Sequence, residues 1–105
     1  MIIVRIQEEN SRIREVIVTG HAEADEFGKD LVCAAVSAIT IGLCNALDEM
    51  TDSVGFEMED NRIRIYVPVM DETAETVLRA GVIQLKTVAE VYSEFVQIIN
   101  GGKMQ

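Results

Sequence analysis

A long uncharged segment, residues 31–47, restricts the fold of this 105-residue chain more than any other feature. It is followed by Asp48-Glu49, and we expect one helix over residues 31–50 that is apolar on nearly all sides. A helix that is apolar all round is buried on more than one side. We therefore expect a sheet to cover one side and a second helix or a second subunit to cover another. Small residues that permit such close approach are Ala34, Ala35, Ser37, Ala38 and Gly42.

The rest of the chain alternates between two kinds of hydrophobic pattern. Apolar residues at every second position indicate strands, and apolar residues at every third or fourth position indicate a helix. Polar turn residues, Glu9-Asn10-Ser11 and Asp60-Asn61, separate neighbouring strands into two hairpins. The patterns predict strands at 2–8, 13–19, 54–59, 62–67 and 95–99 and a second helix at 72–92.

These elements follow one another as β-β-α-β-β-α-β. Two separate domains would each be short of core in a chain of this length, so we expect a single domain over residues 1–105. Hydrophobic residues make up 49% of the chain, yet aromatic residues are only 5% and Trp is absent, so aliphatic side chains must build the core. The order predicts an α+β fold with the two helices packed on one face of a sheet.

The charge balance limits the classes of partner. Acidic residues outnumber basic ones 18 to 9, which gives a formal net charge of -9. Nucleic acid is a poor match, because phosphates are contacted mainly by Lys and Arg. A basic protein partner fits, although simple solubility also explains the excess of acid. We expect a cytoplasmic protein with no secretory signal, and we judge residues 31–47 too short and too polar for a membrane span.

The two cysteines, Cys33 and Cys44, do not form a disulfide if they share the predicted helix. Eleven residues of helix separate them by roughly 16 Å, far beyond the ~7 Å between Cα atoms that a bridge allows. The same separation prevents them from sharing one zinc ion, and Cys44 is read as a buried apolar residue. The chain also has no Walker loop, dinucleotide-binding turn or Cys-x-x-Cys, so we expect no cofactor and no metal.

The chemistry is expected at the only histidine, His21, and at Cys33. His21 follows Gly20 at the end of the second predicted strand, and Cys33 lies near the start of the first predicted helix. A helix N-terminus favours a thiolate, and an imidazole can take the thiol proton. Taken singly, Cys33 is a packed thiol and His21 a surface or capping residue. Their placement at the two ends of one loop, where catalytic groups are commonly mounted, predicts a nucleophile and a general base.

Two neighbours of Cys33 are candidate supporting residues. Asp30 precedes Cys33 by three positions, and Ser37 follows it by four and shares its helix face. Asp30 is equally well explained as a helix cap or first-turn acid, and Ser37 as a small packing residue. First-turn amides near Cys33 would also be placed to bind an oxyanion.

The segment between the two candidates, residues 21–29, is acidic and has no clear period, and we expect a mobile loop there. A solvated loop explains its carboxylates; contact with a basic substrate segment is the functional alternative. The loop residues expected to contact substrate are Glu23, Asp25, Glu26, Phe27 and Gly28.

Three motifs, Gly20-His21-Ala22, Phe27-Gly28-Lys29-Asp30 and the segment 31–38 (Leu-Val-Cys-Ala-Ala-Val-Ser-Ala), resemble the ribosomal-processing cysteine protease family, Prp. Length and element order match over essentially the whole chain, and residues 20–38 carry the motif core. The resemblance implies an endopeptidase that removes the N-terminal extension of a large-subunit ribosomal protein, L twenty-seven.

The resemblance also implies residue roles and partners. Cys33 would be the nucleophile and His21 the general base, with Asp30 and Ser37 in or near the active site. It further implies a homodimer, a flexible loop that covers the substrate, and a basic ribosomal protein precursor as that substrate.

Two other classes of function remain open from the residues themselves. One is a non-enzymatic acidic binding module, such as a ribosome assembly factor that docks a basic protein. The other is a thiol enzyme acting on a small molecule, which is less favoured because no cofactor motif is present. A binding module would keep its function after Cys33→Ala, whereas either enzyme would lose it.

Overall fold

The computed structural model describes residues 1–20 and 27–101, with residues 27–30 described by their backbone alone. The elements are β1 (Ile2–Glu9), β2 (Arg12–Thr19), α1 (Phe27–Met50), β3 (Gly55–Glu59), β4 (Arg62–Tyr66), α2 (Glu72–Val91) and β5 (Val96–Asn100).

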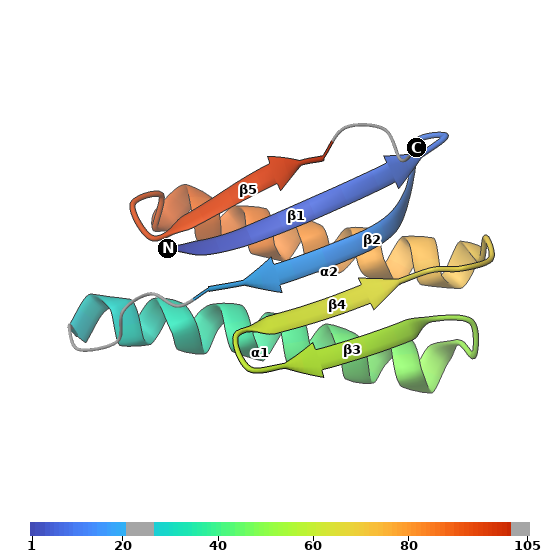
Figure 1. Cartoon of the computed structure of the whole chain (residues 1–105), viewed down its shortest axis with the longest axis horizontal. Coiled ribbons are helices and arrows are strands. Elements are labelled where there is room, and N and C mark those ends of the chain that lie inside the picture. The colour runs from blue at the N-terminus through green and yellow to red at the C-terminus, as the bar shows by residue number, and fades with distance from the viewer. Residues whose placement is uncertain (21–26, 102–105) are drawn as a thin grey trace.

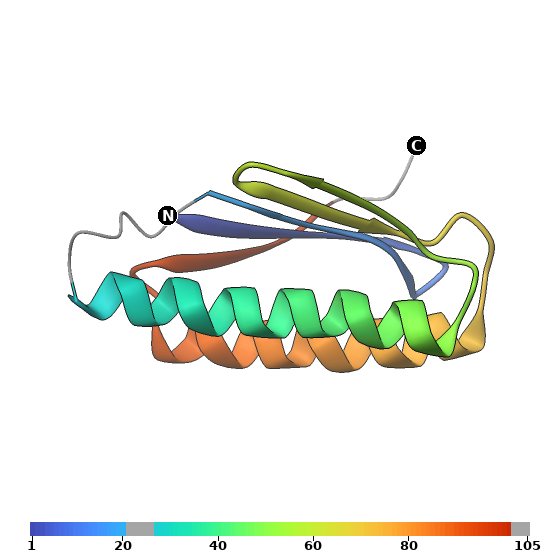
Figure 2. The ribbon, with the colours of Figure 1, turned by 90° about the horizontal axis from the view of Figure 1, so that it is seen from below.

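The five strands form one sheet in the order β3-β4-β2-β1-β5 (Figure 1). All neighbouring strands are antiparallel except β1 and β5, which are parallel. Both helices lie side by side against one face of the sheet, and in the described part of the chain no helix covers the other face (Figure 2). The predicted α+β class, the element order and the packing of both helices on one face are confirmed.

A β-bulge explains why the hydrophobic alternation of the first hairpin is imperfect. In β1, Ile2, Val4 and Ile6 alternate regularly and are buried. In β2 the buried residues Ile13 and Val16 are three positions apart, because the register shifts between Gln7 and Glu8 of β1. A bulge inserts one extra residue into a strand, so both side chains can face the helices.

The two helices pack closely where Gly81 of α2, which has no side chain, faces α1. Gly81 of α2 lies against Leu43 of α1, and a Cβ added at Gly81 would lie 2.5 Å from Leu43 Cδ2. The N-cap of α2 is Asp71, whose carboxylate accepts hydrogen bonds from the backbone N–H of Thr73 and Ala74. The inner face of α1 contributes Val32, Val36, Thr40, Leu43, Cys44 and Leu47 to the core.

The helix α1 begins earlier than the sequence analysis predicts, and this corrects two expectations. Phe27 and Gly28 belong to the helix and not to a loop, and Asp30 is not its cap, because helical residues precede it. A glycine costs a helix only about 1 kcal/mol relative to alanine. Gly28 therefore does not stop a helix whose following residues are held by the core.

The segment Leu31–Met50 is long and apolar enough to cross a membrane by length and composition, contrary to the expectation from sequence. Its packing gives another reason for that composition, because one face of α1 lies in the core. Its outer face still exposes large apolar side chains, among them Leu31 (52% exposed) and Ile41 (47%).

Candidate functional site

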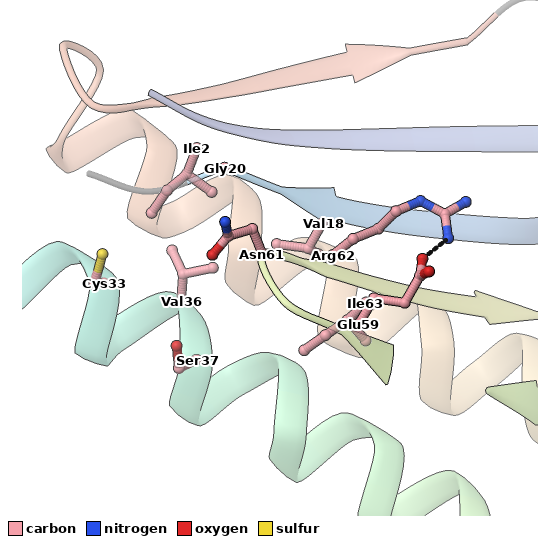
Figure 3. A pocket seen from close by; sticks show the side chains of 10 residues that line it. All are labelled: Ile2, Val18, Gly20, Cys33, Val36, Ser37, Glu59, Asn61, Arg62 and Ile63. Atoms are coloured by element: carbon pink, nitrogen blue, oxygen red, sulfur yellow. Dashed lines mark hydrogen bonds and ion pairs between the residues drawn. The ribbon is translucent and has the colours of Figure 1, made fainter. Parts of the chain in front are cut away.

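Cys33 lies on the side of α1 that faces the end of β2 (Figure 3). Its neighbours Val32 and Val36 are buried in the core, and Cys33 itself is half-buried at the border of that core. Because α1 begins at Phe27, Cys33 lies beyond the first helical turn. The field of a helix N-terminus falls off within that first turn, so the expectation that Cys33 lies at the helix N-terminus, beside the first-turn amides, is wrong.

A pocket of about 420 Å³ opens beside Cys33. Its apolar part comes from β1, β2, β4 and α1, and its polar side chains come from α1 and from the turn between β3 and β4 with the adjoining strand ends (Figure 3). A cavity of this size can bind a small ligand, or a side chain that belongs to a larger ligand. The described residues that line it are Ile2, Val18, Gly20, Cys33, Val36, Ser37, Glu59, Asn61, Arg62 and Ile63.

Gly20, the residue before His21, is fixed on one wall of this pocket. Its backbone has φ +91°, and a Cβ there would collide with the carbonyl oxygen of Met1. Its N–H donates a hydrogen bond of 3.0 Å to the carbonyl of Asn61. Only glycine combines this φ with so close a backbone neighbour. The chain therefore attaches His21 at the pocket that Cys33 lines, although His21 itself lies outside the described residues.

The turn between β3 and β4 continues this wall next to Gly20, across the pocket from α1. Asn61 adopts a left-handed conformation with φ 65°, which asparagine tolerates better than most residues. Beside it, Arg62 donates a hydrogen bond of 3.1 Å to Glu59 and lies 3.6 Å from Glu57. The guanidinium and the Glu59 carboxylate at this end of the pocket are thus already engaged with each other.

Of the predicted site residues, the structure brings Cys33 and Ser37 to the same pocket. Asp30, Phe27 and Gly28 are placed by their backbone in the first part of α1, and their side chains are outside the description. The remaining predicted residues lie outside the described residues: His21, Glu23, Asp25 and Glu26.

The pocket wall formed by the β3–β4 turn was not predicted from the sequence. Asp60-Asn61 was expected as a turn, but nothing in its spacing linked it to Cys33. The link is the pairing of β2 with β4, in which Thr19 faces Arg62 and brings the turn next to Gly20. The two strands differ in length, 8 residues in β2 and 5 in β4, so no local signal in the sequence predicts that their ends meet.

The second cysteine is separate from the pocket. Cys44 is buried in the core, and this burial raises the pKa of its thiol, as desolvation disfavours the charged form. No disulfide joins Cys33 and Cys44, both of which are described. Within residues 1–20 and 27–101, no group of three His, Cys, Asp or Glu side chains is placed to hold a metal ion.

Comparison with known proteins identifies relatives over nearly the whole chain. Residues 1–97 match the family model described as cysteine protease Prp. The ribosomal processing cysteine protease Prp of Staphylococcus aureus (strain Mu50) is 30% identical over 86% of this chain and 89% of its own length. The protein of that name from Mycoplasma pneumoniae is 30% identical over 78% of this chain and 82% of its own length.

Solved structures show the same likeness in three dimensions. The S. aureus Prp in complex with a covalently linked product peptide has a TM-score of 0.86 and 29% identity, covering 96% of this chain and 100% of that one. The same protease with a substrate peptide has a TM-score of 0.85 at 28% identity, with the same coverage. SMU.848 from Streptococcus mutans has a TM-score of 0.80 at 30% identity and 96% coverage of both chains.

Proposed function

Because this chain belongs to the Prp family of cysteine proteases, we propose that it removes the N-terminal extension from the precursor of ribosomal protein L twenty-seven, with Cys33 as nucleophile and His21 as general base. The chain is an enzyme of the ribosomal-processing cysteine protease family, so a non-enzymatic binding module is set aside. The observation that carries the proposal is that Cys33 and Gly20, to which His21 is joined, line one pocket.

The proposed reaction is acyl transfer through the Cys33 sulfur. His21 accepts the thiol proton, and the thiolate attacks the carbonyl carbon of the scissile peptide bond. The tetrahedral intermediate collapses as His21 returns the proton to the leaving amine, which leaves a thioester on Cys33. Water, deprotonated by His21, then attacks the thioester and releases the carboxylate product and the thiol.

A peptide substrate is supported by both the relatives and the pocket. The S. aureus relative has been solved with a substrate peptide and with a covalently linked product peptide. The pocket beside Cys33 has an apolar floor of buried Ile2, Val18 and Val36, which suits the side chain of a peptide. The net charge of -9 favours encounter with a basic ribosomal protein, and such a substrate implies action in the cytoplasm.

Supporting roles are proposed for the residues around Cys33. Ser37 lines the same pocket as the thiol and is proposed to contact the substrate or orient the thiol. Asp30 is proposed to support the site from the start of α1. The acidic segment that carries Glu23, Asp25 and Glu26 is proposed to contact the basic substrate.

We also propose that the enzyme is a homodimer, as the resemblance to its family implies. Leu31 and Ile41 are large apolar side chains that α1 leaves exposed, and their burial against a second subunit would favour a dimer. Ile41→Glu is expected to shift the mass measured by multi-angle light scattering from dimer to monomer. If the wild-type protein is a monomer at micromolar concentration, the proposed dimer is wrong.

The proposed function is tested with a peptide that spans the extension and the first mature residues of L twenty-seven. Intact-mass analysis is expected to show cleavage by the wild-type protein and loss of at least about a thousandfold in rate for Cys33→Ala and for His21→Ala. The matched control is Cys44→Ala, which removes a buried thiol away from the pocket and is expected to keep cleavage. Cleavage by Cys33→Ala at the wild-type rate would contradict the assignment.

A further inference from the structure

The pocket beside Cys33 contains few groups that can form hydrogen bonds with the backbone of a peptide. Its floor is made of aliphatic side chains that cannot form hydrogen bonds, such as Val36 and Ile63. A peptide that enters it loses water from its N–H and C=O groups, and a buried backbone group without a partner is costly. Some of the polar side chains at the rim must therefore replace that water if the peptide is to bind well.

Two of the polar side chains that line the pocket already form contacts with other side chains. Arg62 and Glu59 are paired with each other across the turn, and Arg62 also faces Glu57. The side chains of Ser37 and Asn61, in contrast, form no hydrogen bond with the part of the chain that the structure describes. Ser37 offers a single hydroxyl group, whereas the carboxamide of Asn61 has two N–H donors and a carbonyl acceptor.

Asn61 also has the right position for a peptide held against Cys33. Its side chain points into the pocket from the β3–β4 turn, on the side opposite α1 (Figure 3). Its own backbone is anchored, because its carbonyl accepts the N–H of Gly20 at 3.0 Å. An extended peptide between the two walls would present N–H and C=O groups to this carboxamide.

We propose that Asn61 is a substrate-binding residue whose carboxamide hydrogen-bonds the backbone of the peptide held in the Cys33 pocket. The inference deepens the proposed peptidase function and rests on it. A plainer explanation of Asn61 is that its left-handed backbone, φ 65°, favours asparagine. The two explanations differ in what glycine would do, since glycine adopts that φ freely but has no carboxamide.

Asn10 provides a matched control for the substitution Asn61→Gly. Asn10, in the turn between β1 and β2, is also an exposed asparagine with a left-handed backbone, φ 53°. The turn between β1 and β2 lies at the end of the sheet opposite the β3–β4 turn (Figure 1), and Asn10 does not line the Cys33 pocket. Asn10→Gly therefore makes the same chemical change at a similar backbone conformation without touching the site.

The test measures binding apart from catalysis. A fluorescent peptide of the L twenty-seven extension is titrated with Cys33→Ala, which cannot cleave it, and with the same variant carrying Asn61→Gly or Asn10→Gly. We expect Asn61→Gly to raise Kd about five- to tenfold, the loss of one or two hydrogen bonds, and Asn10→Gly to leave it unchanged. In the active enzyme, Asn61→Gly should raise KM with little change in kcat.

Each other outcome has a distinct meaning. Equal Kd values for the Asn61→Gly and Asn10→Gly proteins would overturn the role of Asn61 while leaving the peptidase in place. A fall in the Tm of Asn61→Gly together with weaker binding would mean that Asn61 stabilises the β3–β4 turn and acts on binding only through it, which would also overturn the proposal. Absence of any binding to Cys33→Ala, with no cleavage by the wild-type protein, would instead reject the substrate and the proposed function itself.

Discussion

Gly81 of α2 and Leu43 of α1 are in such close contact that a Cβ at Gly81 would lie 2.5 Å from Leu43 Cδ2 and 3.0 Å from its Cγ. Both residues are buried, so the leucine has little room to turn away. The absence of a side chain at position 81 thus sets how near the two helices approach each other. Gly42 of α1, by contrast, is exposed and has no atom within 4 Å of an added Cβ.

These two glycines give a matched pair of substitutions. Gly81→Ala is expected to destabilise the protein by about 1–2 kcal/mol, because overpacking costs more than the roughly 1 kcal/mol gained in helix propensity. Gly42→Ala gains the propensity without a clash and is expected to stabilise the protein by up to about 1 kcal/mol. Urea unfolding checks both signs. A stabilising Gly81→Ala would mean that Leu43 repacks freely.

The turn between β1 and β2 carries a serine where glycine fits better. Asn10 and Ser11 both have positive φ, 53° and 66°. Two such residues form the hairpin turn in which Asn-Gly is the favoured pair. Ser11→Gly is expected to raise the free energy of unfolding by about 0.5–1 kcal/mol by relieving the left-handed strain.

Ser11→Ala is the control, since alanine keeps the Cβ and hence the strain. Urea titration should show a higher midpoint and an unchanged slope for Ser11→Gly alone. The contact from Arg79 to the carbonyl of Ser11, at 3.0 Å, uses the backbone and survives in both variants. Equal midpoints for the glycine and alanine variants would show that the turn is not strained.

The cap of α2 predicts a pH dependence of stability. Hydrogen bonds from Ser53 and Thr51, followed by the backbone N–H of Ala74, lower the pKa of Asp71 from 3.8 to about 2. A carboxyl group whose pKa is lower in the folded state stabilises the fold above its unfolded pKa. That contribution is lost as the pH falls from about 4 through about 2.

Asp71→Asn is the variant that isolates this effect. Its Tm is expected to lie below that of the wild-type protein at pH 6, and the difference should shrink as the pH is lowered from 4 to 2. Thermal unfolding at a series of pH values measures it. A Tm difference that stays constant over this range would show that the lower Tm of Asp71→Asn arises from poorer hydrogen-bond geometry of the amide and not from loss of the negative charge.

Most local structure followed from short-range patterns. The alternation of Ile2, Val4 and Ile6 and the polar pair Asp60-Asn61 located the hairpins, and the apolar period from residue 72 located α2. The start of α1 was missed because Gly28 was read as part of a loop over residues 21–29. A local penalty of about 1 kcal/mol is small beside the packing that extends the helix.

The site was predicted only in part because its walls come from distant segments. Cys33 and Ser37 share a helix face, and their spacing alone brings them together. Asn61 and Ile2 reach the same pocket through the pairing of β2 with β4 and with β1. Strand order is a long-range property, and neither residue carries a local signal of it.

The constraint on Gly20 predicts an effect on catalysis beyond its effect on folding. Gly20→Ala must change φ from +91° and move away from the Met1 carbonyl, which displaces the backbone from which His21 extends. A shift of about 1 Å in a catalytic group can cost on the order of a hundredfold in rate. We therefore expect kcat/KM for the L twenty-seven peptide to fall by about that factor.

Gly81→Ala is the control that separates the two effects, because it is also destabilised but lies between the helices and away from the pocket. Both variants are assayed at a temperature where circular dichroism shows each to be fully folded. Gly81→Ala is expected to retain the wild-type kcat/KM under these conditions, and Gly20→Ala is not. Equal kcat/KM values for the two variants would mean that the backbone at Gly20 does not position the general base.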